Sequence, residues 1–221
     1  MPQASIATGL AARINTALPQ TQCTRCGYPD CAAYAEAIAD GAAPINQCPP
    51  GGAEGIARLA ALTGQPALPL NPAFGIEAVR TAAVIDEAWC IGCTLCIAAC
   101  PTDAIFGSNK RMHSVIPAHC TGCELCLPVC PVDCIQMVTA SGSRTGWSAW
   151  STAEADHARL RYVRHSTRLG KDVRQSPKGL GEKISMDPAD PPQAAASIDP
   201  KKATIAAALE RARAKRAASA N

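Results

Sequence analysis

The sequence predicts an α+β protein: a small helical module, then a domain of short helices and hairpin strands built from two similar halves, then a helical, partly disordered basic tail. Three observations support this. Cysteine-rich segments recur along the chain, short alternating strands follow two of them, and large apolar side chains are scarce. The 221 residues include 13 Cys but only 2 Phe, 3 Trp and 3 Tyr. Small domains with so little apolar bulk usually depend on disulfides, metals or a partner.

The start of the chain bears on how the cysteines are used. Residues 1–20 lack the charged segment and apolar run of a secretory signal peptide. We therefore expect a cytoplasmic protein, and the reducing cytoplasm favours metal ligation over disulfides. No stretch of 18 residues is apolar and free of charge, so we also expect no membrane-spanning helix.

The clearest pattern is a four-cysteine run that begins at Cys90 and again at Cys120. Both runs read C-x2-C-x2-C-x3-C-P, the spacing of bacterial-type ferredoxins with two [4Fe–4S] clusters. The fourth cysteine of each run then binds the other cluster, since three close thiolates hold three irons and the fourth iron needs a ligand from another direction. A tetrahedral zinc site does not require a third cysteine at this spacing and a fourth before proline, and still less a repeat of the whole pattern. The predicted ligand sets are Cys90, Cys93, Cys96 and Cys130, and Cys100, Cys120, Cys123 and Cys126.

Residues 80–140 are therefore expected to form a two-cluster ferredoxin domain with pseudo-two-fold symmetry. Cys134 occupies the position of Ala104 in the first half, so we expect a buried apolar filler and not a ligand. Apolar residues beside the runs should form a shell that excludes water from the clusters. The residues expected in this shell are Ile91, Leu95, Ile97, Leu125, Leu127 and Val129.

Another cysteine set lies in the helical module, residues 20–64, with the spacing C-x2-C-x4-C-x16-C. Asp30 and Gly41 are a plausible N-cap and C-terminal stop for a helix over residues 31–40, and a second helix is expected over 53–63. The spacing allows either a third [4Fe–4S] cluster or a zinc site. The candidate ligands are Cys23, Cys26, Cys31 and Cys48.

The remaining segments flank these modules. Residues 1–19 predict an amphipathic helix, over about 5–18, that docks on a neighbouring core, and residues 65–79 predict a Pro-rich linker. In residues 141–221, Trp147 and Trp150 are expected to clamp a helix near 152–169 onto the ferredoxin domain.

The last part of the chain is basic. Residues 156–221 contain 14 Lys and Arg against 7 Asp and Glu, whereas residues 1–155 contain 7 against 11. An Ala-rich helix is expected over Pro200–Ala218. We expect the tail to be solvated and partly disordered. Contact with nucleic acid, anionic lipid or an acidic partner is the alternative.

Residues 18–38, which contain Cys-Thr-Arg-Cys-Gly-Tyr-Pro-Asp-Cys, resemble a known family together with Asn-Gln-Cys-Pro-Pro-Gly-Gly at 46–52. The family is the B subunit of the Rnf/Rsx electron transport complex, a ferredoxin-like bacterial iron–sulfur protein. The likeness continues through the Cys90 run and Cys-Pro-Val-Asp-Cys-Ile at 130–135, and covers about residues 18–140. It implies that the first cysteine set also holds a [4Fe–4S] cluster, which gives three clusters.

The resemblance further implies a relay of low-potential electrons on the cytoplasmic face of the inner membrane. The complex couples electron transfer between ferredoxin and NAD to ion translocation, so the implied partners are its other subunits or a redox partner protein. Many family members begin with a membrane-spanning helix, but only 22 residues precede Cys23 here. We therefore expect membrane contact to be peripheral at most.

Two other functions fit the cysteine pattern: a free-standing soluble polyferredoxin that serves several oxidoreductases, and an iron–sulfur regulatory protein that uses its basic tail. No nucleotide-binding glycine motif is present, so we expect no small-molecule substrate and no catalytic residue. Because the basic tail is expected to be solvated and partly disordered, we also expect no nucleic-acid ligand. His113 and His119 flank the second run without a nucleophile or carboxylate constellation, which favours a supporting role.

Overall fold

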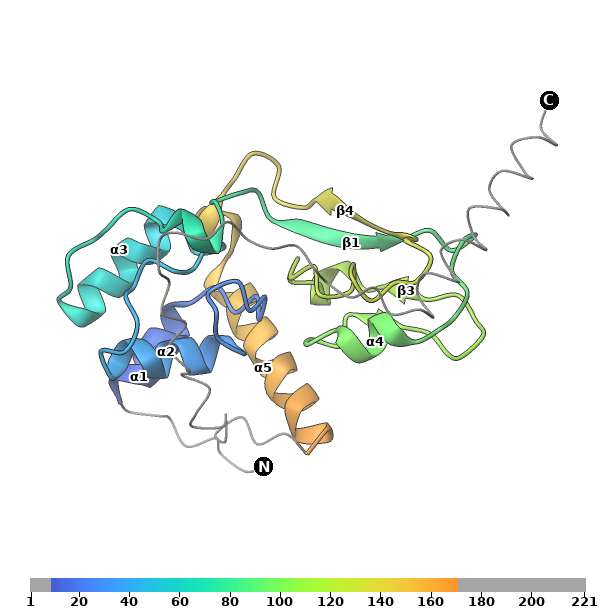
Figure 1. Cartoon of the computed structure of the whole chain (residues 1–221), viewed down its shortest axis with the longest axis horizontal. Helices are drawn as coiled ribbons and strands as arrows, with labels where there is room; N and C mark the ends of the chain where they lie inside the picture. Colours follow the sequence, from blue (N-terminus) through green and yellow to red (C-terminus); the bar gives the residue numbers. More distant parts are fainter. Residues whose placement is uncertain (1–8, 171–221) are drawn as a thin grey trace, which may run out of the picture.

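The computed structural model describes residues 9–170, in which two modules lie side by side and one long helix crosses between them (Figure 1). The first eight residues, the basic tail and its expected helix over Pro200–Ala218 lie outside this range. The first module consists of three helices and the second of four short strands and a five-residue helix. In order, these are α1 (Leu10–Ala17), α2 (Cys31–Ala39), α3 (Gly52–Thr63), β1 (Thr81–Ile85), α4 (Leu95–Ala99), β2 (Ile105–Phe106), β3 (Ser114–Val115), β4 (Ile135–Thr139) and the crossing helix α5 (Thr152–Arg168).

The first module forms where its sequence supplies helix signals. The carboxylate of Asp30 accepts a hydrogen bond from the Ala33 amide at 2.7 Å and caps α2, as its type and position predict. Helix α3 ends at Gly64, whose φ of 73° is the left-handed conformation that glycine adopts without strain. Ile14 and Leu18 are buried in the module core, which fits the docking expected from their spacing.

The second module contains two antiparallel strand pairs. Strands β1 and β4 pair from Thr81 opposite Thr139 to Ile85 opposite Ile135, so the end of the second cysteine half returns to the start of the first. Strands β2 and β3 form the other pair. Residues 64–79, between the modules, include the short 3-10 helix η1 (Pro72–Phe74) and lie against the first module, where the Asn71 amide donates to the Asn46 carbonyl at 2.9 Å.

The apolar shell around the second module differs from the expected one. Leu95 is 49% exposed, so its predicted place in this shell is wrong, whereas Ile91, although 56% exposed, lines the pocket around Cys90, Cys93, Cys96 and Cys130. Helix α4 turns Cys96 inward, and its neighbour Leu95 must then point outward, because adjacent helical residues are about 100° apart. The buried residues of this core come mainly from the strands and the segments after each run: Ala82, Ala83, Ile85, Ala104, Ile105, Val132 and Ile135.

Helix α5 contacts both modules next to their cysteines. Its Tyr162 hydroxyl donates to the Asp30 carboxylate at 2.9 Å in the first module. Its Arg161 guanidinium donates to the Thr102 carbonyl at 2.6 Å in the second. Asp103 accepts from His165 at 2.7 Å and pairs with Arg168, which lowers the Asp103 pKa to about 2. The helix therefore joins segments of the two modules, at Asp30 and Thr102, that are 72 residues apart in the sequence (102 − 30).

The two tryptophans before α5 bind different modules. The indole of Trp147 donates to the Ala17 carbonyl at 2.7 Å, and the Arg58 guanidinium lies 4.1 Å from its ring, so Trp147 anchors the first module. Only Trp150, stacked under Arg80 at 3.9 Å, lies against the second module. The expectation that both clamp the ferredoxin domain is therefore wrong for Trp147. The turn at Gly146 (φ 53°) packs against Glu77 and Gly51, which leaves no room for a β-carbon and directs Trp147 toward α3.

Replacing Trp147 should weaken the attachment of the first module. We expect Trp147→Ala to lower the free energy of unfolding by about 3–5 kcal/mol, since it removes a large buried side chain. Trp147→Phe should cost about 1 kcal/mol through the lost hydrogen bond to Ala17. Anaerobic urea titration followed by circular dichroism would measure both. Leu160→Ala, at an exposed position of α5, is the control, and an equal loss in Trp147→Ala and Leu160→Ala would contradict this account.

Candidate iron–sulfur centres

Three pockets are each surrounded by one of the predicted cysteine sets. The Cys23 set (Cys23, Cys26, Cys31 and Cys48) surrounds a pocket of about 280 Å³. The Cys100 set (Cys100, Cys120, Cys123 and Cys126) surrounds one of about 320 Å³. The Cys90 set (Cys90, Cys93, Cys96 and Cys130) surrounds one of about 260 Å³, which Cys134 also lines. The fold thus brings the fourth cysteine of each run to the other run, and none of the thirteen cysteines, which lie within residues 9–170, forms a disulfide.

Two buried glutamines organise the loop that carries the Cys23 set. The Gln22 side chain accepts from the Cys31 amide at 3.0 Å and donates to Gln20 at 3.0 Å. Gln20 in turn donates to the Asn15 side chain at 2.8 Å, which connects the loop to α1. Both glutamines have positive φ, which non-glycine residues adopt only under constraint. The sequence did not predict their role, because glutamine is not a cluster ligand and its position alone does not indicate an iron–sulfur site.

Tyr34 positions the last ligand of this set. Its hydroxyl donates to the Pro44 carbonyl at 2.8 Å and accepts from the Gln47 amide at 3.1 Å. Tyr34 is buried on α2 and lines the pocket, so these bonds fix the segment that delivers Cys48. The x16 gap between Cys31 and Cys48 is therefore closed by a side chain on the helix that Cys31 begins.

Backbone amides point at the sulfurs of the second module. Amide N–H groups of Ala83, Ala104 and His113 donate to the sulfurs of Cys120, Cys100 and Cys90, at 3.4, 3.1 and 3.3 Å. Such N–H···S bonds stabilise the negative charge of a thiolate-bound cluster. Gly122 makes the close turn within its run possible: its φ is 68°, and a β-carbon there would overlap the Thr81 carbonyl.

Two polar side chains lie in the pocket of the Cys90 set. The Nδ1 atom of buried His113 lies 3.3 Å from the Cys96 sulfur. The Cys134 sulfur lies 3.5 Å from that of Cys130. Cys134 is buried as the sequence predicts, but it contacts a member of the set instead of only filling the core. His119 faces His157 of α5 instead, with ring centres 5.3 Å apart.

The pockets suit a metal cluster that supplies positive charge. Burial raises the pKa values of Cys26 and Cys96 to about 11 and that of Cys126 to about 12, and it also raises those of Cys31 and Cys48. Buried thiols of this kind give up their protons when a metal binds them. The sulfurs surround a pocket, as the ligands of a cubane must. Within residues 9–170, no three Cys, His, Asp or Glu side chains converge on a point in the way that a single metal ion requires.

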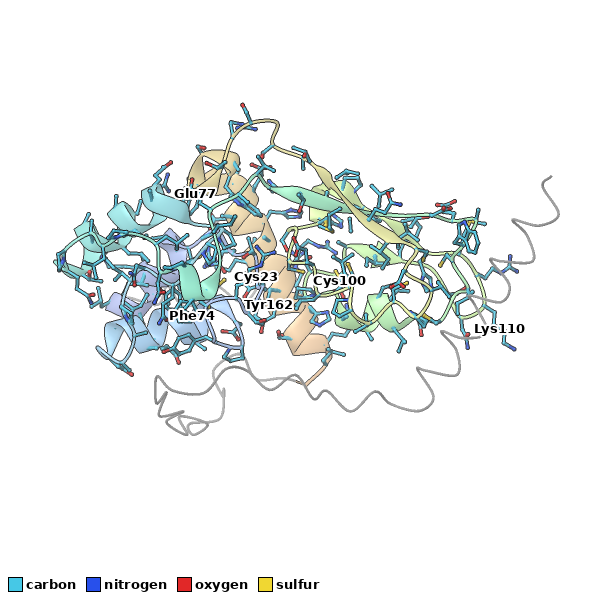
Figure 2. All side chains as sticks on the ribbon, turned by 45° about the horizontal axis from the view of Figure 1, so that its top comes forward. Cys23, Phe74, Glu77, Cys100, Lys110 and Tyr162 are labelled. Atoms are coloured by element: carbon cyan, nitrogen blue, oxygen red, sulfur yellow. The ribbon has the colours of Figure 1, made fainter. Side chains whose placement is uncertain are left out.

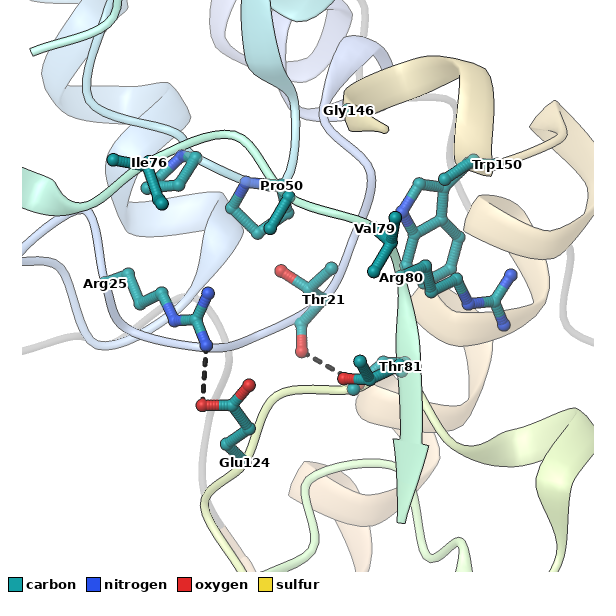
Figure 3. Close-up of a pocket in the computed structure, with 15 residues that line it drawn as sticks. Thr21, Arg25, Pro50, Ile76, Val79, Arg80, Thr81, Glu124, Gly146 and Trp150 are labelled. Carbon is teal, nitrogen blue, oxygen red and sulfur yellow. Dashed lines mark hydrogen bonds and ion pairs between the residues drawn. The ribbon is translucent and has the colours of Figure 1, made fainter. Parts of the chain in front are cut away.

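The pockets of the Cys23 and Cys100 sets are joined by direct contacts. The Thr121 hydroxyl, in the wall of the Cys100 pocket, donates to the carbonyl of Thr21, in the wall of the Cys23 pocket, at 2.9 Å. Nearby, Arg25 and Glu124 form an ion pair at 2.7 Å, and Figure 3 shows these two side chains facing each other between the modules. Figure 2 places Cys23 and Cys100 in the middle of the molecule and Lys110 at its far end.

Comparison with known proteins gives a separate family match for each of the two modules. Residues 83–137 match the family model described as a 4Fe-4S dicluster domain, and residues 18–50 match one described as a putative Fe-S cluster. A relative from Alkalilimnicola ehrlichii, named as the B subunit of an ion-translocating oxidoreductase complex, is 53% identical over 152 residues, which cover 68% of this chain and 81% of the relative. This chain belongs to that B-subunit family.

Other members of the family give the same result over shorter spans. The relative from Hahella chejuensis is 56% identical over 138 residues, covering 62% of this chain and 69% of its own length. The relative from Thiobacillus denitrificans is 58% identical over 107 residues, covering 48% of this chain. This chain thus matches just over half, 57%, of the length of that relative. No solved structure matches the chain. Among its described helices, none has the length and apolar character needed to cross a membrane.

Removing one cysteine of the Cys23 set should abolish iron binding at that set and leave the other two sets unaffected. We expect Cys48→Ala to lower the iron content of the anaerobically reconstituted protein from about twelve to about eight per chain, since the Cys23 pocket lies in its own module. The electron paramagnetic resonance (EPR) signals from the second module should persist. Cys134→Ala is the matched control and should keep about twelve irons. About eight irons plus bound zinc in the unaltered protein would contradict a cluster at Cys48.

Proposed function

We propose that this chain is an electron-transfer subunit that carries three [4Fe–4S] clusters, on the Cys23, Cys100 and Cys90 sets. The support is that three separate pockets are each surrounded by four thiols, in segments that match iron–sulfur family models. When bound, each cluster would accept and release one electron. The chain's own residues contribute the ligands, the amide donors to sulfur, and the exclusion of water. In this proposal Cys134 is not a ligand.

The order of the three pockets supports a linear relay. The Cys23 and Cys100 pockets share the contact between Thr21 and Thr121, which supports a middle position for the Cys100 set. The Cys90 set lies toward the other end, because the Lys110 amide donates to the Gly92 carbonyl within that run at 2.9 Å and Lys110 is at the far end in Figure 2. The relay would therefore run through the Cys23, Cys100 and Cys90 sets in either direction.

The name of the relatives supports membership of a complex. Each is named as the B subunit of an ion-translocating oxidoreductase complex, so we propose other subunits of such a complex as partners. We also propose a place on the cytoplasmic face with peripheral membrane contact. We further propose pseudo-two-fold symmetry for residues 80–140, which the matching amide bonds of Ala83 and His113 to the first cysteine of a run support. No described feature favours a free-standing polyferredoxin.

Rapid mixing with a chemically reduced ferredoxin tests the relay. In the unaltered protein we expect all three EPR signals to appear after freeze-quenching. Thr121→Ala removes the buried bond to Thr21, and it should slow equilibration between the Cys23 cluster and the other two without loss of iron. Thr139→Ala, an exposed threonine of β4, is the control. Failure of the reduced ferredoxin to reduce any cluster would contradict the proposed function, and equal rates in the two variants would contradict the proposed order.

A further inference from the structure

Two side chains distinguish the Cys90 pocket from the Cys100 pocket. His113 and Ala83 hold matching places, since the amide of each donates to the sulfur of the first cysteine of a run, at 3.3 and 3.4 Å. Cys134 and Ala104 also match, since each is the fourth residue after the last cysteine of a run. Both pairs are 30 residues apart (113 − 83 and 134 − 104). The Cys90 pocket thus has an imidazole and a thiol where the Cys100 pocket has two alanine methyl groups.

The His113 ring is built into the pocket wall. The residue is 1% exposed, and its Nδ1 atom lies 3.3 Å from the Cys96 sulfur. Space for the ring depends on Gly107, where a β-carbon would come within 2.5 Å of the His113 ring. Its buried Nε2 atom has no hydrogen-bond partner among the described residues. A cluster-bound cysteine sulfur carries no proton, so the imidazole must be the donor in this contact.

The Cys134 thiol makes a second contact of the same kind. Its sulfur lies 3.5 Å from the Cys130 sulfur and lines the same pocket. With Cys130 bound to iron as a thiolate, the only proton between the two sulfurs belongs to Cys134, which then donates. Ala104, at the matching place, offers only its amide, which donates to the Cys100 sulfur at 3.1 Å.

We propose that His113 and Cys134 tune the cluster of the Cys90 set to a higher reduction potential than the cluster of the Cys100 set. The inference rests on the cluster assignment proposed above. One-electron reduction of a cubane with four thiolates changes its total charge from about −2 to about −3, and no bond breaks and no proton moves. Donors to the thiolates stabilise the more negative form, which raises the potential. Electrons shared by the two clusters therefore collect at the Cys90 end, away from the first module.

Redox titration of the full, iron-loaded chain, with dithionite as reductant and EPR detection, tests this. We expect His113→Ala and Cys134→Ala each to shift one midpoint to more negative values. In the double variant, the ratio of reduced to oxidised cluster at a fixed potential should fall about tenfold. This corresponds to a midpoint potential that is more negative by about 59 mV. The other two midpoints should not move. The matched control is His157→Ala, a histidine of α5 that lines none of the cysteine pockets, and it should leave all three midpoints unchanged.

Conservative variants separate a lost donor from a lost side chain. Cys134→Ser and His113→Asn keep a hydrogen-bond donor, so they should retain most of the wild-type potential at unchanged iron content. Equal shifts in Cys134→Ser and Cys134→Ala would overturn the donor role of Cys134.

Isotope labelling gives a readout that can be taken on the unaltered protein. In protein labelled with 15N-histidine, pulsed EPR should detect nitrogen coupling to one reduced cluster, and His113→Asn should remove it. If the protein shows three EPR signals and about twelve irons, but no such coupling and no shift of the midpoints in the variants, the tuning role is overturned while the three-cluster proposal stands. Fewer irons in the unaltered protein would instead count against the proposed function.

Discussion

The structure depends on one constraint: twelve thiols surround three pockets that they cannot stabilise by themselves. Burial raises the pKa values of several of these thiols, so without metal they favour the neutral form. Iron would supply the positive charge and the covalent connections that a chain with so few large apolar residues lacks. The left-handed turns, the amide donors and the buried glutamines have the same effect, because each helps to hold a cysteine in position at its pocket.

Contacts between the modules form a second layer of organisation. Helix α5 bonds Asp30 through Tyr162 and the carbonyl of Thr102 through Arg161, and both partners lie next to cysteines. Trp147 holds α1 and α3 from the far side. The arrangement of the Cys23 and Cys100 pockets is therefore held by several hydrogen bonds spread over the chain as well as by the segment that joins the modules. This rigidity is what an electron relay needs, since transfer depends on spacing.

The grouping of the cysteines could be predicted from the sequence because the spacing within each run is a local property, while their role as cluster ligands stays a prediction. The two repeated runs define their own geometry, and the fold groups their sulfurs as that spacing requires. The partner of Trp147 could not be predicted, because it depends on how Gly146 packs against Glu77, which is 69 residues away in the sequence (146 − 77). Leu95 differs from its prediction because it lies beside Cys96 on α4. Cys96 occupies the inward face of this short helix, so Leu95 is exposed although it is hydrophobic. The approach of His113 to Cys96 likewise appears only in three dimensions.

The central claim is that iron organises residues 20–140, and nuclear magnetic resonance of the full chain before and after anaerobic cluster loading tests it most directly. We expect the iron-free chain to give a poorly dispersed amide spectrum with little exchange protection in α2 and β1. Loading should restore dispersion together with protection in both modules. A stable, well-dispersed spectrum from the iron-free chain would contradict the claim.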